Sequence, residues 1–218
     1  MSTQALDQYQ LGPTEQAKGL AKVKLDNSFT SKEQGAFNFF SSEIVPYITD
    51  YFVLSDDLRT RVGMDEEYRR CYHDYSFLVF PVHKAFEAYL VGVLSFVFQF
   101  KISGKKNETI GYYLKYYPDD ERKKKLENLA KKFPKVDIQK WTDRWQSLGQ
   151  CWTDNRNPLI HPEQKVPTFR IAEQITSTIL SEMRISVGAV MIDILDPLIE
   201  QIEKKGKNEE KIVKTEGI

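Results

Sequence analysis

The feature that most constrains this fold is a long apolar segment between residues 78 and 100. Apolar side chains recur there at intervals of three and four residues, at Leu78, Val82, Phe86, Tyr89, Val93, Val97 and Phe100. This is the repeat of an α-helix, and a helix that is apolar over most of its circumference must be buried on several sides. The spacing therefore predicts a helix of about six turns at the centre of a bundle. Its charge-free part, residues 88–100, is too short to span a bilayer, so we expect no membrane segment.

A second helical region is expected upstream of this segment. The sequence Ser31-Lys-Glu-Gln34 has the spacing of a capping box and predicts a helix start. Apolar positions then recur up to Tyr51, and Pro46 predicts a kink. Acidic residues after Ser55 predict the start of a further short helix that ends near Tyr72.

Two more helices are expected in the second half of the chain. Their apolar stripes are Trp141, Trp145, Leu148 and Trp152, and then Ile171, Ile175, Ile179, Met183, Val187, Val190, Ile194 and Leu198. The first of these helices should end near Asn157, because Pro158 lacks the backbone donor and clashes with the preceding turn.

The predicted fold is therefore all-α, a bundle with long central helices, short additional helices and polar termini. No segment shows the alternating pattern of a strand, and no internal repeat is present. We predict a helical domain over residues 31–204. Residues 1–30 are polar and without a clear period, which favours a flexible arm, and residues 205–218 are predicted to be a charged flexible tail.

The charge of the chain is balanced overall but not locally. It has 31 Lys and Arg against 31 Asp and Glu, which excludes a globally basic protein that packages nucleic acid. Residues 101–140 carry twelve basic and six acidic side chains, interleaved with tyrosines at 112, 113, 116 and 117. This segment is either a solvated helical face or a patch for the phosphates of a nucleic acid.

Metal and cofactor chemistry is not indicated. Cys71 and Cys151 are isolated, and His73, His83 and His161 do not have the spacing of metal ligands. The chain contains no HExxH, DxDxDG or GxSxG motif. We predict no bound metal and no cofactor. Cysteine usage and the lack of a signal peptide favour a reducing, cytoplasmic location.

One short segment carries candidate chemistry, at the proline that interrupts the tryptophan helix. Arg156 and His161 lie five positions apart in Arg156-Asn-Pro-Leu-Ile-His161. A guanidinium can hold a phosphate bidentately and stabilise the charge of a transition state, and an imidazole can move a proton near neutral pH. Arg156 extends the tryptophan stripe, so it should point inward or at a partner. The alternative interpretation is a helix start, with Asn157 as N-cap and Pro158 in the first turn.

These residues resemble the signature of the HEPN superfamily, an Arg, a polar residue that is often Asn, a short spacer and a His. The stretch from Tyr75 to Tyr89 looks like the corresponding upstream helix of RNase LS-type toxins of bacterial toxin–antitoxin modules. The resemblance covers about residues 70–200. It implies an HEPN-like bundle in which Arg156 and His161 are catalytic, Asn157 orients the motif, and Glu87 is the acidic residue of the upstream helix.

Glu87 also stands out without the resemblance, as an ionisable residue in an apolar helix. It lies on one helical face with Lys84 and His83, which we expect to bind substrate. It either forms an intrahelical ion pair with Lys84 or His83, or it holds Arg156 or His161 in place.

The resemblance further implies a metal-independent endoribonuclease that cleaves RNA by attack of the 2′-OH. Such enzymes are homodimers with a composite active site. The expected role is a toxin, with a possible antitoxin partner, or an antiviral effector. Two alternatives remain open: a catalytically silent HEPN module that binds a protein or nucleotide, and a structural helical protein in which the motif is fortuitous.

Overall fold

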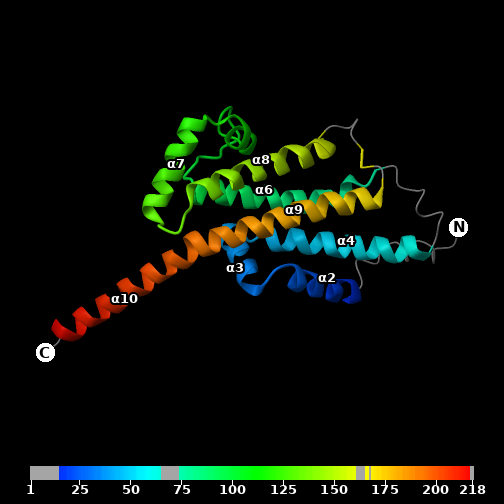
Figure 1. The fold of residues 1–218 in the computed structure, drawn as a ribbon. Helices are drawn as coiled ribbons and strands as arrows, with labels where there is room; N and C mark the ends of the chain where they lie inside the picture. Colours follow the sequence, from blue (N-terminus) through cyan, green and yellow to red (C-terminus); the bar gives the residue numbers. More distant parts are fainter. Residues whose placement is uncertain (1–14, 65–73, 161–164, 167, 217–218) are drawn as a thin grey trace.

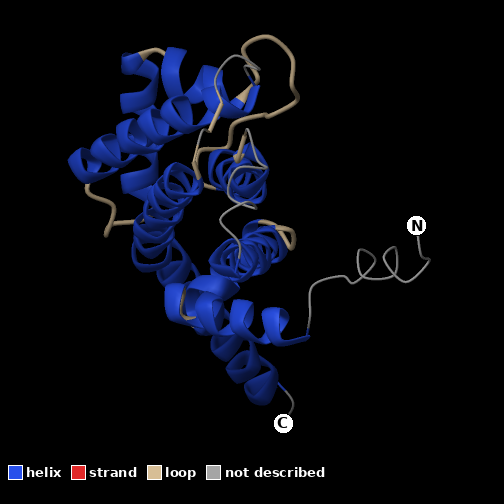
Figure 2. Ribbon diagram, turned by 90° about the vertical axis from the view of Figure 1, so that its right-hand side faces the viewer, coloured by secondary structure: helices blue, strands red, loops and turns tan. Residues whose placement is uncertain are grey.

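The computed structural model describes residues 15–64, 74–160, 165–166 and 168–216, and at the helix ends 15–16, 60–64, 157–160 and 207–216 it describes the backbone alone. These residues form eight α-helices and two π-helical turns, and no strand lies among them. The long helices run side by side in Figure 1, and several are seen nearly end-on in Figure 2. The prediction of an all-α bundle is confirmed.

Helix α6 (Ser76–Phe96) lies at the centre of the bundle, as its periodicity predicts. It contacts α3 (Ser31–Phe40), α4 (Ile44–Met64), α8 (Ile138–Ile160) and α9 (Phe169–Val190). By length and composition α6 is apolar enough to cross a membrane, but most of it is buried within the bundle. It ends at Phe96, before Phe100, the last residue of its apolar stripe, and Gln99 beyond it takes a left-handed conformation with φ of 55°.

The amino-terminal region corrects one prediction. Residues 15–28, expected to belong to a flexible arm, form helix α2 (Glu15–Ser28), which packs on α4. Ala17, Ala21, Leu25 and Phe29 are buried at intervals of four residues. Their burial provides the tertiary packing that outweighs a polar composition. Residues 1–14, the rest of the expected arm, lie outside the described residues.

The next two helices begin close to their predicted positions but with different details. The capping box of α3 is formed by Thr30 and Glu33, one residue before the expected pair. Helix α4 is continuous from Ile44, so the expected kink at Pro46 and the restart after Ser55 are wrong. Pro46 lies in the first helical turn, where a missing N–H removes no hydrogen bond.

The basic segment folds around an aromatic cluster. Tyr113, in the π-helical turn η1 (Tyr112–Tyr116), stacks on Phe100 with ring centroids 4.1 Å apart. Arg122 of α7 (Asp119–Lys132) is buried and lies 5.3 Å from the centre of the Trp145 ring. Helix α7 has acidic residues in its first turn and lysines in its last, which matches the helix dipole. Part of the basic and aromatic composition therefore has a structural explanation.

The last helices are longer than predicted. Helix α8 continues to Ile160, so its predicted end near Asn157 is wrong, and Pro158 lies within the helix. After α9, the π-helical turn η2 (Met191–Leu195) leads directly into α10 (Asp196–Glu216). Residues 205–216, expected to be a flexible tail, are helical, and α10 projects beyond the bundle (Figure 1).

Candidate functional site

The candidate site lies where the last turns of α8 pass the first half of α6. Trp152 of α8 is buried, and its ring centre is 5.0 Å from that of His83 on α6. The guanidinium carbon of Arg156 is 5.4 Å from the centre of the same indole. Trp152 therefore links the imidazole of His83 to the cation of Arg156 across two helices.

Arg156 is exposed, so of its two expected directions, inward or toward a partner, the structure excludes the first. It is one helical turn beyond Trp152, and a cation over an indole face is favoured electrostatically while it keeps its contact with water. The preceding residue, Asn155, takes the buried position instead, and its Nδ2 donates to the carbonyl of Cys151 at 2.9 Å. The arrangement leaves the guanidinium of Arg156 free to bind an anion from solvent.

His83 is buried, with 7% of its surface exposed, so a ligand in solvent has little access to its imidazole, and its predicted role in substrate binding stays a prediction. The pKa of His83 is lowered from 6.5 to about 4, mainly by burial; the charges of Lys84 and Arg156 contribute in the same direction, whereas Glu87 acts in the opposite direction. Its Nε2 atom is buried and has no hydrogen-bond partner among the residues that the structure describes. His83 is therefore neutral at pH 7 and packs as an aromatic ring. The pKa effects also show that the charges of Lys84, Glu87 and Arg156 surround this imidazole.

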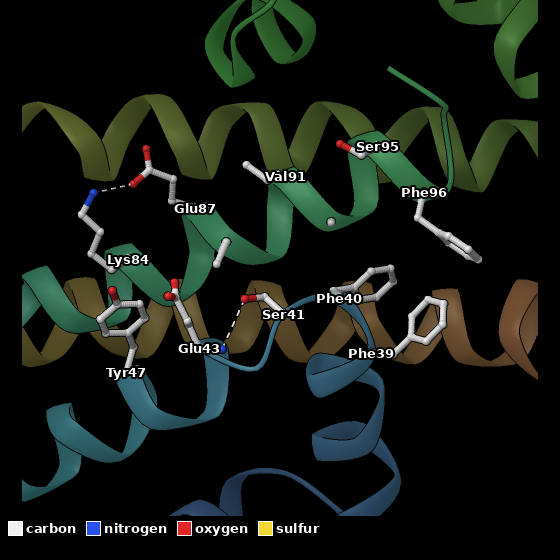
Figure 3. A pocket seen from close by; sticks show the side chains of 12 residues that line it. Phe39, Phe40, Ser41, Glu43, Tyr47, Lys84, Glu87, Val91, Ser95 and Phe96 are labelled. Atoms are coloured by element: carbon white, nitrogen blue, oxygen red, sulfur yellow. Dashed lines mark hydrogen bonds and ion pairs between the residues drawn. The ribbon is translucent and has the colours of Figure 1, made fainter. Parts of the chain in front are cut away.

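Lys84 and Glu87 form an ion pair on the outer face of α6, with Nζ and Oε2 2.8 Å apart. Each side chain is more than one third exposed, and the Lys84 ammonium also lies 5.6 Å from the centre of the Phe80 ring. The partner that the structure gives Glu87 is thus the intrahelical lysine, one of its two predicted roles. Both side chains face a groove, shown in Figure 3.

This groove, of about 770 Å³, runs between α6 and the junction of α3 with α4. One end is aromatic, where Phe39 and Phe96 meet edge to face with ring centroids 4.8 Å apart beside Phe40 (Figure 3). The other end is charged, where Glu43 and Tyr47 lie across from Lys84 and Glu87 (Figure 3).

The sequence did not predict this groove, because it depends on how α3 meets α6. One residue gives a signal: at Gly92 an added Cβ would lie 2.5 Å from the Cβ of Phe40. A glycine inside so apolar a helix indicates that another segment approaches its backbone closely.

Four of the six predicted site residues are thus in one region: Arg156, His83, Lys84 and Glu87. His161 and the side chain of Asn157 lie outside the described residues, so their predicted roles stay predictions. Among the side chains that the structure describes, no group of three or more His, Cys, Asp or Glu residues could hold a metal ion. The chemistry available from this region is anion binding by Arg156 beside a paired lysine and glutamate.

Comparison of the chain with protein-family models, with curated proteins and with solved structures finds no match. The resemblance to HEPN proteins is therefore one of sequence, in the motif between Arg156 and His161 and in the upstream helix.

Proposed function

We propose that this protein is a metal-independent endoribonuclease of the HEPN type. The observation that supports this function best is the position of Arg156. It is an exposed cation, held over the Trp152 indole near the end of a long helix, and its charge acts on His83 together with those of Lys84 and Glu87. These helices are the ones that carry the two stretches resembling HEPN proteins. An exposed guanidinium fixed by an aromatic ring suits recognition of a phosphodiester.

In the proposed reaction a base removes the proton of the ribose 2′-OH, and the oxygen attacks the adjacent phosphorus. The bond to the departing 5′-oxygen breaks, and an acid protonates that oxygen. The products are a 2′,3′-cyclic phosphate and a 5′-OH end. Arg156 binds the phosphate and stabilises its developing negative charge, and His161 transfers the proton. DNA, which lacks the 2′-OH, is not cleaved.

We further propose that the active enzyme is a homodimer. In-line displacement needs a proton acceptor on one side of the phosphorus and a donor on the other, which a single imidazole does not supply. A two-fold axis that brings two copies of Arg156 and His161 together supplies both groups. The outer face of α6 suits such an axis, because Phe80 is 52% exposed beside Lys84 and Glu87, which can pair reciprocally with a second copy. We assign the activity to a cytoplasmic toxin, controlled by an antitoxin, or to an antiviral effector.

A catalytically silent binding module is the second candidate, and the groove favours it. The aromatic end formed by Phe39, Phe40 and Phe96 offers apolar contacts, and Glu43 and the Lys84–Glu87 pair supply polar groups at its other end. Concave sites with a few polar groups on an apolar lining are typical of ligand binding. In this case Arg156 would have no role in chemistry.

The deciding experiment is a gel assay on total RNA with EDTA present and matched single-stranded DNA alongside. We expect the wild type to cleave RNA and to spare DNA, and we expect Arg156→Ala and His161→Ala to be inactive. Arg170→Ala removes another exposed arginine, and His73→Ala removes a histidine outside the motif. Both controls should cleave normally. Folded wild type that leaves RNA intact would favour the binding module instead.

A further inference from the structure

A second pocket, the α7 pocket, lies between α7, the end of α6 and the junction of η2 with α10. Helix α7 packs mainly on α8, which leaves a space of about 530 Å³ beside the last turn of α6. This volume is within the range of pockets that bind small molecules. The α7 pocket meets the groove of Figure 3 at Phe96, but the end of α8 that carries Arg156 lies at the opposite end of the bundle from α7 (Figure 1).

One face of α7 supplies the rim of this pocket. Lys125, Asn128, Leu129 and Lys132 all line it, and their spacing of three, four and seven residues places them on one side of the helix. Leu129 is buried, whereas Lys125 is half-buried and Asn128 and Lys132 are exposed. The two lysines are about 10.5 Å apart along the helix axis, with the amide of Asn128 between them. The rim is therefore cationic.

Aromatic rings hold both ammonium groups without neutralising them. Nζ of Lys125 donates to the carbonyl of Phe98 at 3.1 Å and lies 5.0 Å from the centre of the Phe100 ring. The hydrogen bond helps to cap the end of α6, and it uses one of the three donors of the ammonium. Nζ of Lys132 lies 5.3 Å from the centre of the Phe133 ring. Both cations are thus positioned and keep their charge.

None of the described residues that line the α7 pocket is acidic, and no ion pair joins either of its lysines to a described carboxylate. On the adjoining segments, Asp193 is hydrogen-bonded to an indole of α8, and Asp196 forms an ion pair with a lysine of α3. Glu121 of α7 hydrogen-bonds to a tyrosine that precedes the helix. Glu127 lies on the other side of α7, since neighbouring residues differ by about 100° around a helix. The positive charge of the rim therefore suits an anion.

The floor of the α7 pocket is apolar. Phe98, Leu129 and Ile194 are buried there, and Leu198 is half-buried beside them. These four side chains have no hydrogen-bonding group. A hydrocarbon chain needs no polar partner on such a floor, whereas the polar edge of a nucleotide base would lose its hydrogen bonds to water. The floor therefore favours an aliphatic body over a base.

We propose that the α7 pocket binds an aliphatic organic anion, a carboxylate or a phosphate carried on a hydrocarbon chain. The head group lies at the rim, where Lys125 and Lys132 supply charge-assisted hydrogen bonds and Asn128 a further donor. The chain covers the floor and removes its apolar surface from water. This site is separate from Arg156, so the proposal does not rest on RNA cleavage.

The first test titrates the full-length protein with octanoate and with octyl phosphate by calorimetry. We expect saturable binding of at least one of them, and the tighter of the two identifies the head group. Octylammonium and 1-octanol should bind at least tenfold more weakly, because they lack the anion. Butanoate should also bind at least tenfold more weakly than octanoate, because it has four fewer methylenes to bury. Equal affinities for octanoate and octylammonium would overturn the proposal, and so would tighter binding of AMP than of either octyl anion.

Methyl NMR shows where the anion binds. Signals of Ile194 and Leu198 should shift on addition of the tighter octyl anion, whereas those of Val91, which lines the groove and not the α7 pocket, should stay in place. Shifts confined to Val91 would place the anion in the groove and contradict the proposal.

Two neighbouring lysines give a matched pair of variants. Lys131 and Lys132 both lie in the last turn of α7, so each replacement by Met removes the same favourable interaction with the helix dipole. Only Lys132 lines the pocket. Lys132→Met should weaken binding of the octyl anion about tenfold, and Lys131→Met should change it less than about twofold. Circular dichroism checks that both variants stay helical. Equal weakening by the two replacements would overturn the site, and none of these measurements uses RNA cleavage, so they are independent of the proposed function.

Discussion

The imidazole of His83 and the indole of Trp152 lie with their ring centres 5.0 Å apart, tilted by 30°, and this contact joins α6 to α8. Because Arg156 lies over the same indole, the exposed cation is coupled to the core through one aromatic ring. The position of the cation therefore depends on the packing of the two helices and not on a loop.

Replacement of Arg156 should lower the rate of RNA cleavage without changing the stability of the protein. We expect Arg156→Ala to lower the rate of RNA cleavage by about 10²–10³, the usual effect of removing one preorganised group that stabilises transition-state charge. Because Arg156 is exposed, the free energy of unfolding should change by less than about 0.5 kcal/mol. Cleavage rates and urea denaturation of the same preparations measure both effects. An Arg156→Ala enzyme with the wild-type rate would contradict the proposed function.

Stability should fall in mild acid because of His83. Its pKa is about 4 in the folded protein against an ordinary 6.5, so the unfolded chain binds a proton at a higher pH than the folded chain does. The neutral His83 therefore makes its full contribution to the free energy of unfolding above about pH 6.5. As the pH falls toward 4, up to about 3 kcal/mol of this free energy is lost.

The variant His83→Met isolates the effect of His83, because methionine does not titrate. The carboxylates titrate in both proteins, so their effect on stability cancels in the comparison. Urea denaturation at pH 7 and pH 4.5 should show a smaller loss of stability for His83→Met than for the wild type. Equal losses in the two proteins would show that the imidazole is not the group responsible.

Two glycines form a matched pair for testing the packing of the groove. Gly92→Ala places a Cβ 2.5 Å from the Cβ of Phe40, so α3 must shift. We expect the free energy of unfolding to fall by about 1–3 kcal/mol. Gly188 also lies in a helix, and an added Cβ there meets nothing within 4 Å. Gly188→Ala should therefore stabilise the protein by about 0.5–1 kcal/mol. Thermal denaturation measures the stability of both variants. If Gly92→Ala were as stable as the wild type, Phe40 would move aside without loss of stability, contrary to this prediction.

The sequence predicted the parts of this fold that depend on strong helical periodicity. Helices α6 and α9 follow from apolar stripes that repeat over many turns, and the tryptophan stripe predicted α8. Helix α2 was missed although Ala17, Ala21, Leu25 and Phe29 repeat at four residues, because two of the four are alanines and the other apolar residues of the helix, Leu20 and Val23, are exposed and do not fit the repeat. The prolines do not interrupt helices as predicted: Pro46 lies in the first turn of α4, and Pro158 lies within α8.

The candidate site was predicted less completely than the fold, because a site depends on which helices meet. Periodicity places Arg156 on the stripe of Trp152, but its exposure depends on Asn155 taking the buried position. His83 shares a helix with Lys84 and Glu87, yet it faces Trp152 while the other two face the groove. The aromatic end of the groove combines α3 with the end of α6, a pairing that no local pattern contains.

Trp152 offers the sharpest test of the link between the core and the exposed cation. Trp152→Leu keeps an apolar side chain but removes the aromatic surface beside both His83 and Arg156. We expect the free energy of unfolding to fall by about 1–3 kcal/mol, because the smaller side chain leaves a cavity. Water reaching that cavity should raise the pKa of His83 toward 6.5, which NMR titration of the imidazole measures, and cleavage should slow because Arg156 loses its platform.

Trp141→Leu is the matched control on the same helix. It also leaves a cavity and removes the hydrogen bond from Nε1 to Asp193, so its loss of stability should be at least as large. Trp141 is eleven residues, or about 16 Å, along the helix from Trp152, so the pKa of His83 and the cleavage rate should stay near their wild-type values. If the two variants slowed cleavage equally at equal stability, the indole of Trp152 would have no particular role in positioning Arg156.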